Sequence, residues 1–399
     1  MKKLINLLAV VALVASVQVA NAADQSVAGG FEASGSIVSG FGWQKYKNAG
    51  AASANLAADY NGFTAGVLGA YLPPGAVVND KDQEFQFFVD SIELDLAKTF
   101  GENIRFRTDL DFGSTNMGSG VNFGAAANNG AVLVEQAYAT TNFAVGNGIE
   151  FLLGRFNAPI GFEAVDVANL DTISHSKFFN AGIRPANLTG AKFYYPFSDS
   201  LDFNFYLVND LTDDAVKDLG TADSNRPSFG LRFGYSWGDE GAENVVGLSA
   251  AGGWENTPAA GSEKLSYLGD LDFNVHVGDA FAVGGEVLYR LDGKLATGGA
   301  NNKYYAGLLN LNYDFSDVWD GTFRYAYSND VTGGAGTASV GSLGGGNGKF
   351  HEVALVGGYS IADGAKFKLE ANYTMVQTDV AAIPNPSIMG LAGVLSYNF

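Results

Sequence analysis

The chain has 399 residues, of which 47% are hydrophobic and only 16% are charged, with 53 glycines, no cysteine and a formal net charge of −19. This much apolar and aromatic side chain excludes a disordered chain, and the lack of cysteine excludes a disulfide scaffold and thiolate metal sites. After the first 20 residues no run approaches the roughly 18 apolar residues of a membrane-spanning helix, so a glycine- and aromatic-rich β protein is indicated.

The N-terminus has the features of a secretory signal peptide. Lys2 and Lys3 precede the largely apolar segment 4–19, and small residues at 20–22 suit a signal peptidase. We therefore predict cleavage after Ala22 and one domain over 23–399, exported to a Gram-negative cell envelope.

Alternation of side chains with a period of two predicts strands through most of the chain. Between Ile104 and Phe112, even positions are apolar or threonine and odd positions are charged, which gives a strand one apolar and one ionic face. The predicted strands are 29–44, 53–60, 63–71, 85–97, 103–113, 131–142, 148–156, 188–197, 200–209, 226–237, 243–254, 263–275, 280–291, 302–315, 318–328, 349–360, 364–375 and 388–399.

The connections between these strands alternate in length, which is typical of an outer-membrane β-barrel with short periplasmic turns and long extracellular loops. All four tryptophans, Trp43, Trp237, Trp254 and Trp319, fall near strand ends, where an indole prefers the membrane interface. We predict a transmembrane antiparallel barrel of about 18 strands, in the range 16–18, wide enough for an aqueous lumen.

Part of the chain resembles a known family. The segment from Gly154 to Glu163 reads GRFNAPIGFE, and it resembles the signature of the OmpL-like β-barrel porin-2 family. The matching motif residues are Gly154, Phe156, Pro159, Gly161, Glu163, Ser174, His175, Ser176, Pro185 and Gly190. Asp210 stands where the family usually has glycine. The resemblance implies an outer-membrane channel for small solutes.

The longest connection, 157–187, suggests a functional role, because long ordered loops in compact proteins are often functional. One hypothesis is that it folds into the barrel and narrows the pore, with Glu163, Asp166, Asp171 and Arg184 at the constriction. The alternative is an external loop packed over the rim. His175 lies between two serines, but no nucleophile elbow surrounds it, so we predict no enzymatic activity.

Side-chain parity places charges of both signs in the lumen. The expected pore-lining residues are Arg105, Arg107, Asp109, Asp111, Lys192, Arg232, Glu286, Arg290 and Arg324. Arg105 and Arg107 could pair with Glu93 and Asp95 on the neighbouring strand as an ionic ladder, or basic and acidic residues could face each other across the pore. The acidic chain leads us to expect weak cation preference.

A general diffusion porin is the expected function. The alternatives are a substrate-selective channel, suggested by inward Tyr194, Tyr206 and Tyr304, and a non-conducting structural or adhesive barrel. Expected partners are outer-membrane lipid and lipopolysaccharide, small solutes, and the barrel-insertion machinery, which would recognise the terminal Phe399. A homotrimer is left open. No Walker loop, zinc-ligand spacing or basic patch is present, so no cofactor, metal or nucleic acid is expected.

Overall fold

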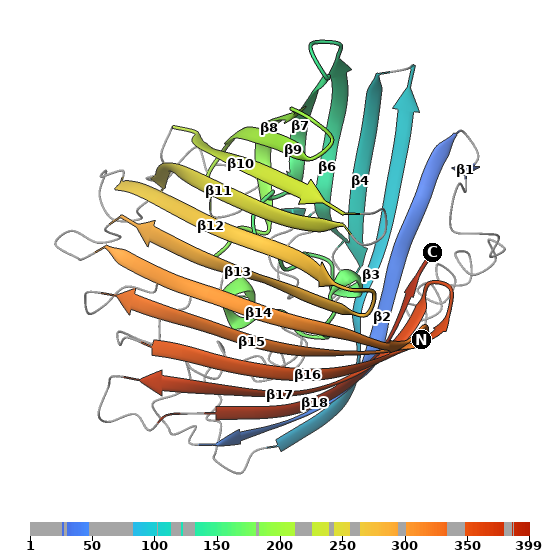
Figure 1. Cartoon of the computed structure of the whole chain (residues 1–399), viewed down its shortest axis with the longest axis vertical. Coiled ribbons are helices and arrows are strands. Elements are labelled where there is room, and N and C mark those ends of the chain that lie inside the picture. Colours follow the sequence, from blue (N-terminus) through green and yellow to red (C-terminus); the bar gives the residue numbers. More distant parts are fainter. Residues whose placement is uncertain are drawn as a thin grey trace.

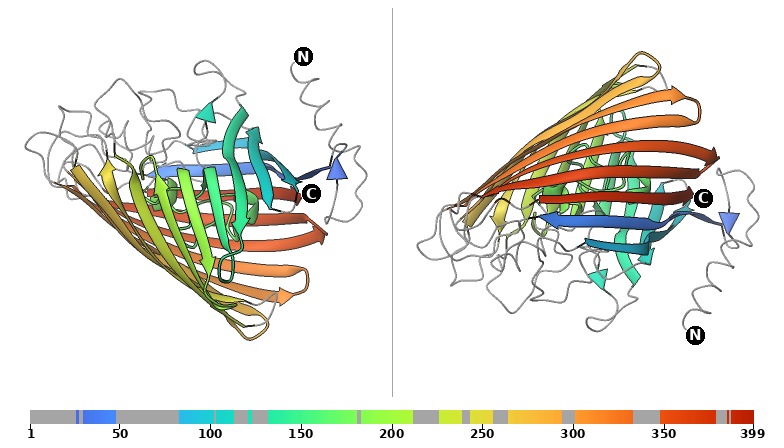
Figure 2. Two further views of the ribbon diagram at one scale, coloured as in Figure 1. Left: turned by 90° about the horizontal axis from the view of Figure 1, so that it is seen from above. Right: turned by 90° about the horizontal axis from the view of Figure 1, so that it is seen from below.

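A computed structural model describes residues 26–27, 30–47, 83–101, 103–112, 121–122, 132–180, 183–211, 226–238, 243–255, 264–293, 301–332, 348–378, 385 and 387–399. Their strands form a single closed antiparallel sheet, a β-barrel, whose wall surrounds a common interior (Figures 1 and 2). The predicted fold class is confirmed.

Sixteen long strands build the described wall. They are β2 (Phe31–Lys47), β3 (Gln83–Phe100), β4 (Ile104–Phe112), β6 (Val132–Phe143), β7 (Ile149–Asn157), β8 (Asn187–Pro196), β9 (Leu201–Val208), β10 (Ser228–Trp237), β11 (Asn244–Glu255), β12 (Lys264–Val277), β13 (Phe281–Asp292), β14 (Asn302–Ser316), β15 (Trp319–Thr332), β16 (Gly348–Ala362), β17 (Ala365–Thr378) and β18 (Ser387–Asn398). Two-residue strands β1 (Ser26–Val27) and β5 (Val121–Asn122) flank it.

Each long strand pairs with its neighbour along the chain, and β18 pairs with β2 to close the ring. The seam extends to the last residue, because Gly35 and Phe399 exchange two backbone hydrogen bonds of 3.0 Å. Closure leaves the wall without an unpaired edge, which is the condition for a sheet to lie in lipid.

The alternation in the sequence separates the two faces of the wall. Along β13, Val287 is 63% exposed on the outside, whereas its neighbours Glu286 and Leu288 are buried on the inside. Exposed aromatic residues gather beside the short turns, as Trp237 and Trp319 do at the ends of their strands. The outer surface is therefore apolar with aromatic ends, as lipid requires.

Two predicted strands, 53–60 and 63–71, lie outside the described residues, as does the predicted signal peptide. Strand β2 pairs directly with β3, from Glu32 opposite Ala97 to Lys45 opposite Gln83, so the wall closes without those two segments. The number of long strands is therefore at the lower end of the predicted range.

The connection from β7 to β8 contains a 3-10 turn, η3 (Val167–Asn169), and a short helix, α3 (Lys177–Asn180), drawn in green in Figure 1. None of the helices in the described part of the chain is long and apolar enough to cross a membrane.

Candidate functional site

The connection between β7 and β8, residues 158–186, is called here the inner loop because it contacts the inward face of the wall. At its base, the Ala158 N–H donates to the Ala186 carbonyl (2.8 Å). Gly161 then adopts φ +82°, and a Cβ at this position would overlap the Glu286 carboxylate and the Arg184 guanidinium. The Phe162 N–H donates to Glu286 Oε2 (2.5 Å). Only glycine fits this turn, which directs the chain into the barrel.

Apolar side chains of the inner loop pack against apolar side chains of the wall. Ile160, Phe178 and Ile183 are at most 5% exposed and belong to one buried cluster with Tyr206 and Tyr304. Because these two tyrosines are covered by the loop, they do not provide the solute-facing aromatic track suggested by the sequence. The apolar cluster also explains why part of the inward face departs from the polar pattern expected of a lumen.

Glu163 and Arg324 form the centre of the attachment between loop and wall. Arg324 Nη1 lies 2.9 Å from Glu163 Oε1, and both side chains are at most 3% exposed. Glu163 also accepts hydrogen bonds from the Ser176 N–H (2.8 Å) and hydroxyl (2.6 Å). Arg324 donates in addition to Thr172 and pairs with Glu352 on β16. One guanidinium thus joins two loop segments to two strands.

Other wall residues hold the following part of the loop. Glu370 on β17 accepts hydrogen bonds from the Ile173 N–H (2.6 Å) and from the Ser174 hydroxyl (2.6 Å). Asn310 on β14 donates to Asp171 (2.7 Å), and Lys368 donates to the Leu170 carbonyl. Burial raises the pKa of Asp171, against the lowering effect of nearby lysines.

His175 is held in place by contacts with other residues of the inner loop. Its ring stacks on Phe179 with 4.2 Å between centroids, and Nε2 donates to the Ala164 carbonyl (2.9 Å). Burial lowers its pKa, although the Glu163 carboxylate acts in the opposite direction. The flanking Ser174 and Ser176 hydroxyls donate to Glu370 and Glu163. All three residues therefore fix the conformation of the inner loop.

The four residues expected at a constriction are not equivalent. Glu163 and Arg184 are buried, and Arg184 donates to the Glu163 carbonyl (2.6 Å) and lies 3.8 Å from Glu286. Asp166 and Asp171 are half-buried at contacts with the wall. The motif residues likewise shape or anchor the loop: Gly154 has φ +142°, and a Cβ there would overlap the Ala137 carbonyl.

The expected pore-lining residues also differ in the exposure of their side chains. Arg105 and Arg107 keep 43% and 34% of their side chains exposed. By contrast, Lys192 is half-buried over the Phe156 ring. At most 14% of the side chain or of the whole residue is exposed in the others, which are Arg232, Arg290, Arg324, Asp109, Asp111 and Glu286. Of the suggested ladder, Arg107 approaches Asp95 (3.6 Å), whereas Arg105 pairs with Glu32 (2.6 Å).

An acidic cluster lies on the inward face of β3, β4 and β6, beside η3 of the inner loop. Its members are Glu93, Asp95, Asp109, Asp111, Glu135 and Asp166. A β-bulge on β6 leaves Glu135 without an opposite residue, because Gln136 pairs with Asp109 and Val134 pairs with Leu110. The bulge buries Glu135 beside Gln136, where strict alternation would place it in lipid. A glutamate at a strand position where alternation predicts a lipid-facing side chain is the signal that could have identified the bulge.

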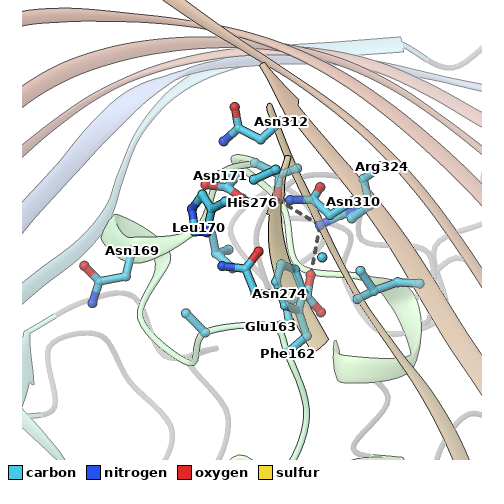
Figure 3. A pocket seen from close by; sticks show the side chains of 15 residues that line it. Phe162, Glu163, Asn169, Leu170, Asp171, Asn274, His276, Asn310, Asn312 and Arg324 are labelled. Atoms are coloured by element: carbon cyan, nitrogen blue, oxygen red, sulfur yellow. Dashed lines mark hydrogen bonds and ion pairs between the residues drawn. The ribbon is translucent and has the colours of Figure 1, made fainter. Parts of the chain in front are cut away.

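A polar pocket of about 290 Å³ lies between the inner loop and β12–β15 (Figure 3). Its lining includes four asparagines, Asn169, Asn274, Asn310 and Asn312, together with His276. In the described structure, Asn310 Oδ1, Asn312 Oδ1 and His276 Nδ1 are buried and have no hydrogen-bond partner. Its lining residues come from four strands and the inner loop, so no local sequence pattern indicates this pocket.

Comparisons with known proteins agree with this architecture. The sequence model of a family described as "Putative beta-barrel porin-2, OmpL-like" matches residues 30–399. A search of curated proteins gives no match. Among solved structures, the fold is similar to the outer-membrane channel DcaP of Acinetobacter baumannii, with a TM-score of 0.63, 12% identity and coverage of 93% of this chain and 97% of that one.

Two further solved structures are similar. The anion-selective porin from Comamonas acidovorans has a TM-score of 0.55 and 15% identity, covering 92% of this chain and 99% of that one. The trimer form of OmpT, an outer-membrane protein of Vibrio cholerae, has a TM-score of 0.50 and 13% identity, with coverage of 92% and 99%. At these identities the likeness concerns the fold.

Proposed function

Because the chain belongs to the OmpL-like β-barrel porin-2 family and is a porin of the bacterial outer membrane, we propose that it is a passive diffusion channel for small hydrophilic solutes and ions, narrowed by the inner loop. The observation that carries this proposal is the attachment of residues 158–186 to inward side chains of β13–β17, above all through Glu163 and Arg324. The family and the fold favour a channel over an enzyme.

The distribution of charge supports a weak preference for cations. Arg232 and Arg324 are buried in contacts with Asp272, Glu163 and Glu352, so their charge is largely compensated. The acidic cluster, by contrast, faces a single arginine of the described ion pairs, Arg107. An uncompensated negative potential in a confined lumen enriches cations. The Comamonas porin is anion-selective, so this charge distribution, and not the shared fold, supports the proposed preference.

Planar-bilayer recordings of the refolded mature chain test both parts of the proposal. We expect open-channel steps, a reversal potential on the cation side in a tenfold KCl gradient, and weaker selectivity as the salt concentration rises. An anion-side reversal potential would contradict the preference. Silence from a barrel shown to be folded by its heat-modifiable migration would contradict the channel and favour a structural or adhesive role.

The same recordings test the role of the inner loop through a deletion of residues 164–180. The base contact between Ala158 and Ala186 is retained in this variant. If the loop narrows the pore, the conductance of the folded variant rises above that of the parent chain. Equal conductance would show that the loop does not set the width of the pore.

The pocket between the inner loop and β12–β15 favours a second candidate, a solute-selective channel. Buried amides with unpartnered oxygens suit neutral solutes rich in hydroxyl or amide groups, and the volume suits one small molecule. Adding such a solute, for example a monosaccharide, would then produce resolved interruptions of the current. An uninterrupted current would favour general diffusion.

We also propose the following for the whole protein. The signal peptide 1–22 is removed, and 23–399 forms one domain whose outer surface contacts lipid and lipopolysaccharide. The insertion machinery reads the strand that ends at Phe399, a residue that in the folded barrel completes the seam with Gly35. The trimer form of OmpT supports a homotrimer as the assembly.

A further inference from the structure

The acidic cluster holds more carboxyl groups than the neighbouring cations pair with. Carboxylate oxygens of Glu93, Glu135 and Asp166 all lie within 4.8 Å of one another, and the same holds for Glu93, Asp95 and Asp109. Of the ion pairs among the described residues, those that reach the cluster come from Arg107, at 2.7 Å from Asp109 and 3.6 Å from Asp95. Among these ion pairs the six carboxylates therefore share the Arg107 guanidinium, while Arg155 Nε donates to the backbone carbonyl of Glu135 (3.0 Å).

Hydrogen bonds satisfy only some of the carboxylate oxygens. Ser36 donates to Glu93 (3.2 Å), Ser34 to Asp95 (3.0 Å) and Asn169 to Asp166 (3.0 Å), while Arg107 and Gln136 both donate to Asp109. Hydrogen bonds between carboxyl groups join Glu135 to Asp111 and Asp166. No donor from outside the described cluster reaches the buried oxygens Glu135 Oε1, Asp166 Oδ1 and Asp95 Oδ1. Glu135 is 8% exposed, and the β6 bulge directs it toward Glu93 and Asp166.

A buried carboxylate without a partner is costly, and buried charges in proteins are generally paired or coordinate metals. The donors here are all oxygens, so they suit a hard cation. Ca²⁺ accepts six to eight oxygen ligands in flexible geometry, whereas Mg²⁺ requires a nearly ideal octahedron. Ligands gathered from three strands and a loop turn match the less demanding ion.

We infer that Glu93, Glu135 and Asp166, with Asp95 and Asp109 beside them, bind one Ca²⁺ ion between the wall and the inner loop. Asp166 is the N-cap residue of η3, so the ion joins this turn to β3 and β6. The wall strand that carries Arg324 is β15, and the ion therefore provides a second attachment of the loop, at a different part of the barrel. This site goes beyond the proposed function, because passive diffusion does not require it.

Isothermal titration of the folded mature chain in detergent, after removal of divalent ions with EDTA, tests the inference. CaCl₂ is the probe and MgCl₂ the competitor. We expect one Ca²⁺ per chain, weaker binding of Mg²⁺, and roughly tenfold or greater loss of Ca²⁺ affinity in Glu135→Gln and in Asp166→Asn, because ligand charge sets affinity. Asp202→Asn is the matched control, since Asp202 faces inward on β9 away from the cluster. This control should bind Ca²⁺ like the parent chain.

Thermal unfolding provides a second readout. Ca²⁺ should raise the Tm of the parent chain and of Asp202→Asn, and should leave the Tm of Glu135→Gln unchanged, because a ligand of the folded state stabilises that state. The inference is overturned if the folded parent chain binds no Ca²⁺ between pH 5 and pH 8, or if both cluster variants bind it with unchanged affinity. Neither measurement requires current, so a non-conducting barrel would leave this result independent.

Discussion

Arg324 is a wall residue whose surroundings belong mainly to the inner loop. Its side chain is 2% exposed, and it contacts Glu163, Thr172 and Ser174 of the loop as well as Glu352 of the neighbouring strand. Removal of one partner from such a network leaves buried charges without compensation. The resulting loss of stability is larger than the net stabilisation that the ion pair itself provides. Arg105 is the contrasting case, since its pair with Glu32 is nearly half exposed on both sides.

We expect Arg324→Ala to lower the free energy of unfolding by about 3–5 kcal/mol, because the buried Glu163 and Glu352 carboxylates would both lose the guanidinium that compensates their charge. The matched variant Arg105→Ala should cost at most about 1 kcal/mol, as is usual for an exposed pair. Urea titration of the folded barrel in lipid vesicles measures both values. Equal losses in the two variants would contradict the central role assigned to Arg324.

The inner loop as an element depends on the turn at Gly161. Two requirements meet there: a positive φ, and space for the Glu286 carboxylate and the Arg184 guanidinium. Gly148, in the short turn between β6 and β7, also has a positive φ (+96°), but a Cβ there would have no atom within 4 Å. Substitution of the two glycines by alanine therefore allows the cost of backbone strain to be separated from the cost of steric overlap.

Gly148→Ala should destabilise the barrel by about 1–2 kcal/mol, the cost of a left-handed conformation for alanine. Gly161→Ala should cost about 1–3 kcal/mol more, because the methyl group also displaces its charged neighbours. We further expect Gly161→Ala alone to change single-channel conductance, since the loop leaves the wall at this turn. Thermal unfolding and bilayer recordings check these outcomes, and the same conductance for both variants would contradict the argument.

At the scale of the whole molecule, the lipid around the barrel determines which outward substitutions are tolerated. Val287 lies in the middle of β13 and is 63% exposed, whereas Val277 is the last residue of β12, beside a short turn, and is 58% exposed. A similar exposed side chain at each site allows the effect of depth in the membrane to be compared directly.

Val287→Arg should cost about 2–4 kcal/mol and Val277→Arg at most about 1 kcal/mol, because the penalty for arginine on the lipid face falls from the bilayer midplane to the interface. Denaturant titration in vesicles provides both values. A larger cost at Val277 would contradict the assigned position of the barrel in the membrane.

The sequence by itself determined the class of fold, its compartment and the expected lumen charges. Side-chain alternation is local, so segments such as 104–112 reveal their two faces without knowledge of their neighbours. The alternating lengths of the connections then indicated a membrane barrel, and the motif around Gly154 and Glu163 indicated the family. The sixteen long strands of the described wall lie within the predicted range of 16–18, and the predicted strands 53–60 and 63–71 lie outside the described residues.

Only the tertiary structure decided which lumen residues contact the inner loop. Glu163 and Arg324 are 161 positions apart, and no local pattern indicates that they meet. Glu352 lies on the inward face of β16, and Glu135 reaches the inward face because a bulge shifts the register of β6. The sequence predicted no metal for the same reason: the proposed ligands have no local spacing, and they come together only when three strands and a loop turn meet inside a closed barrel.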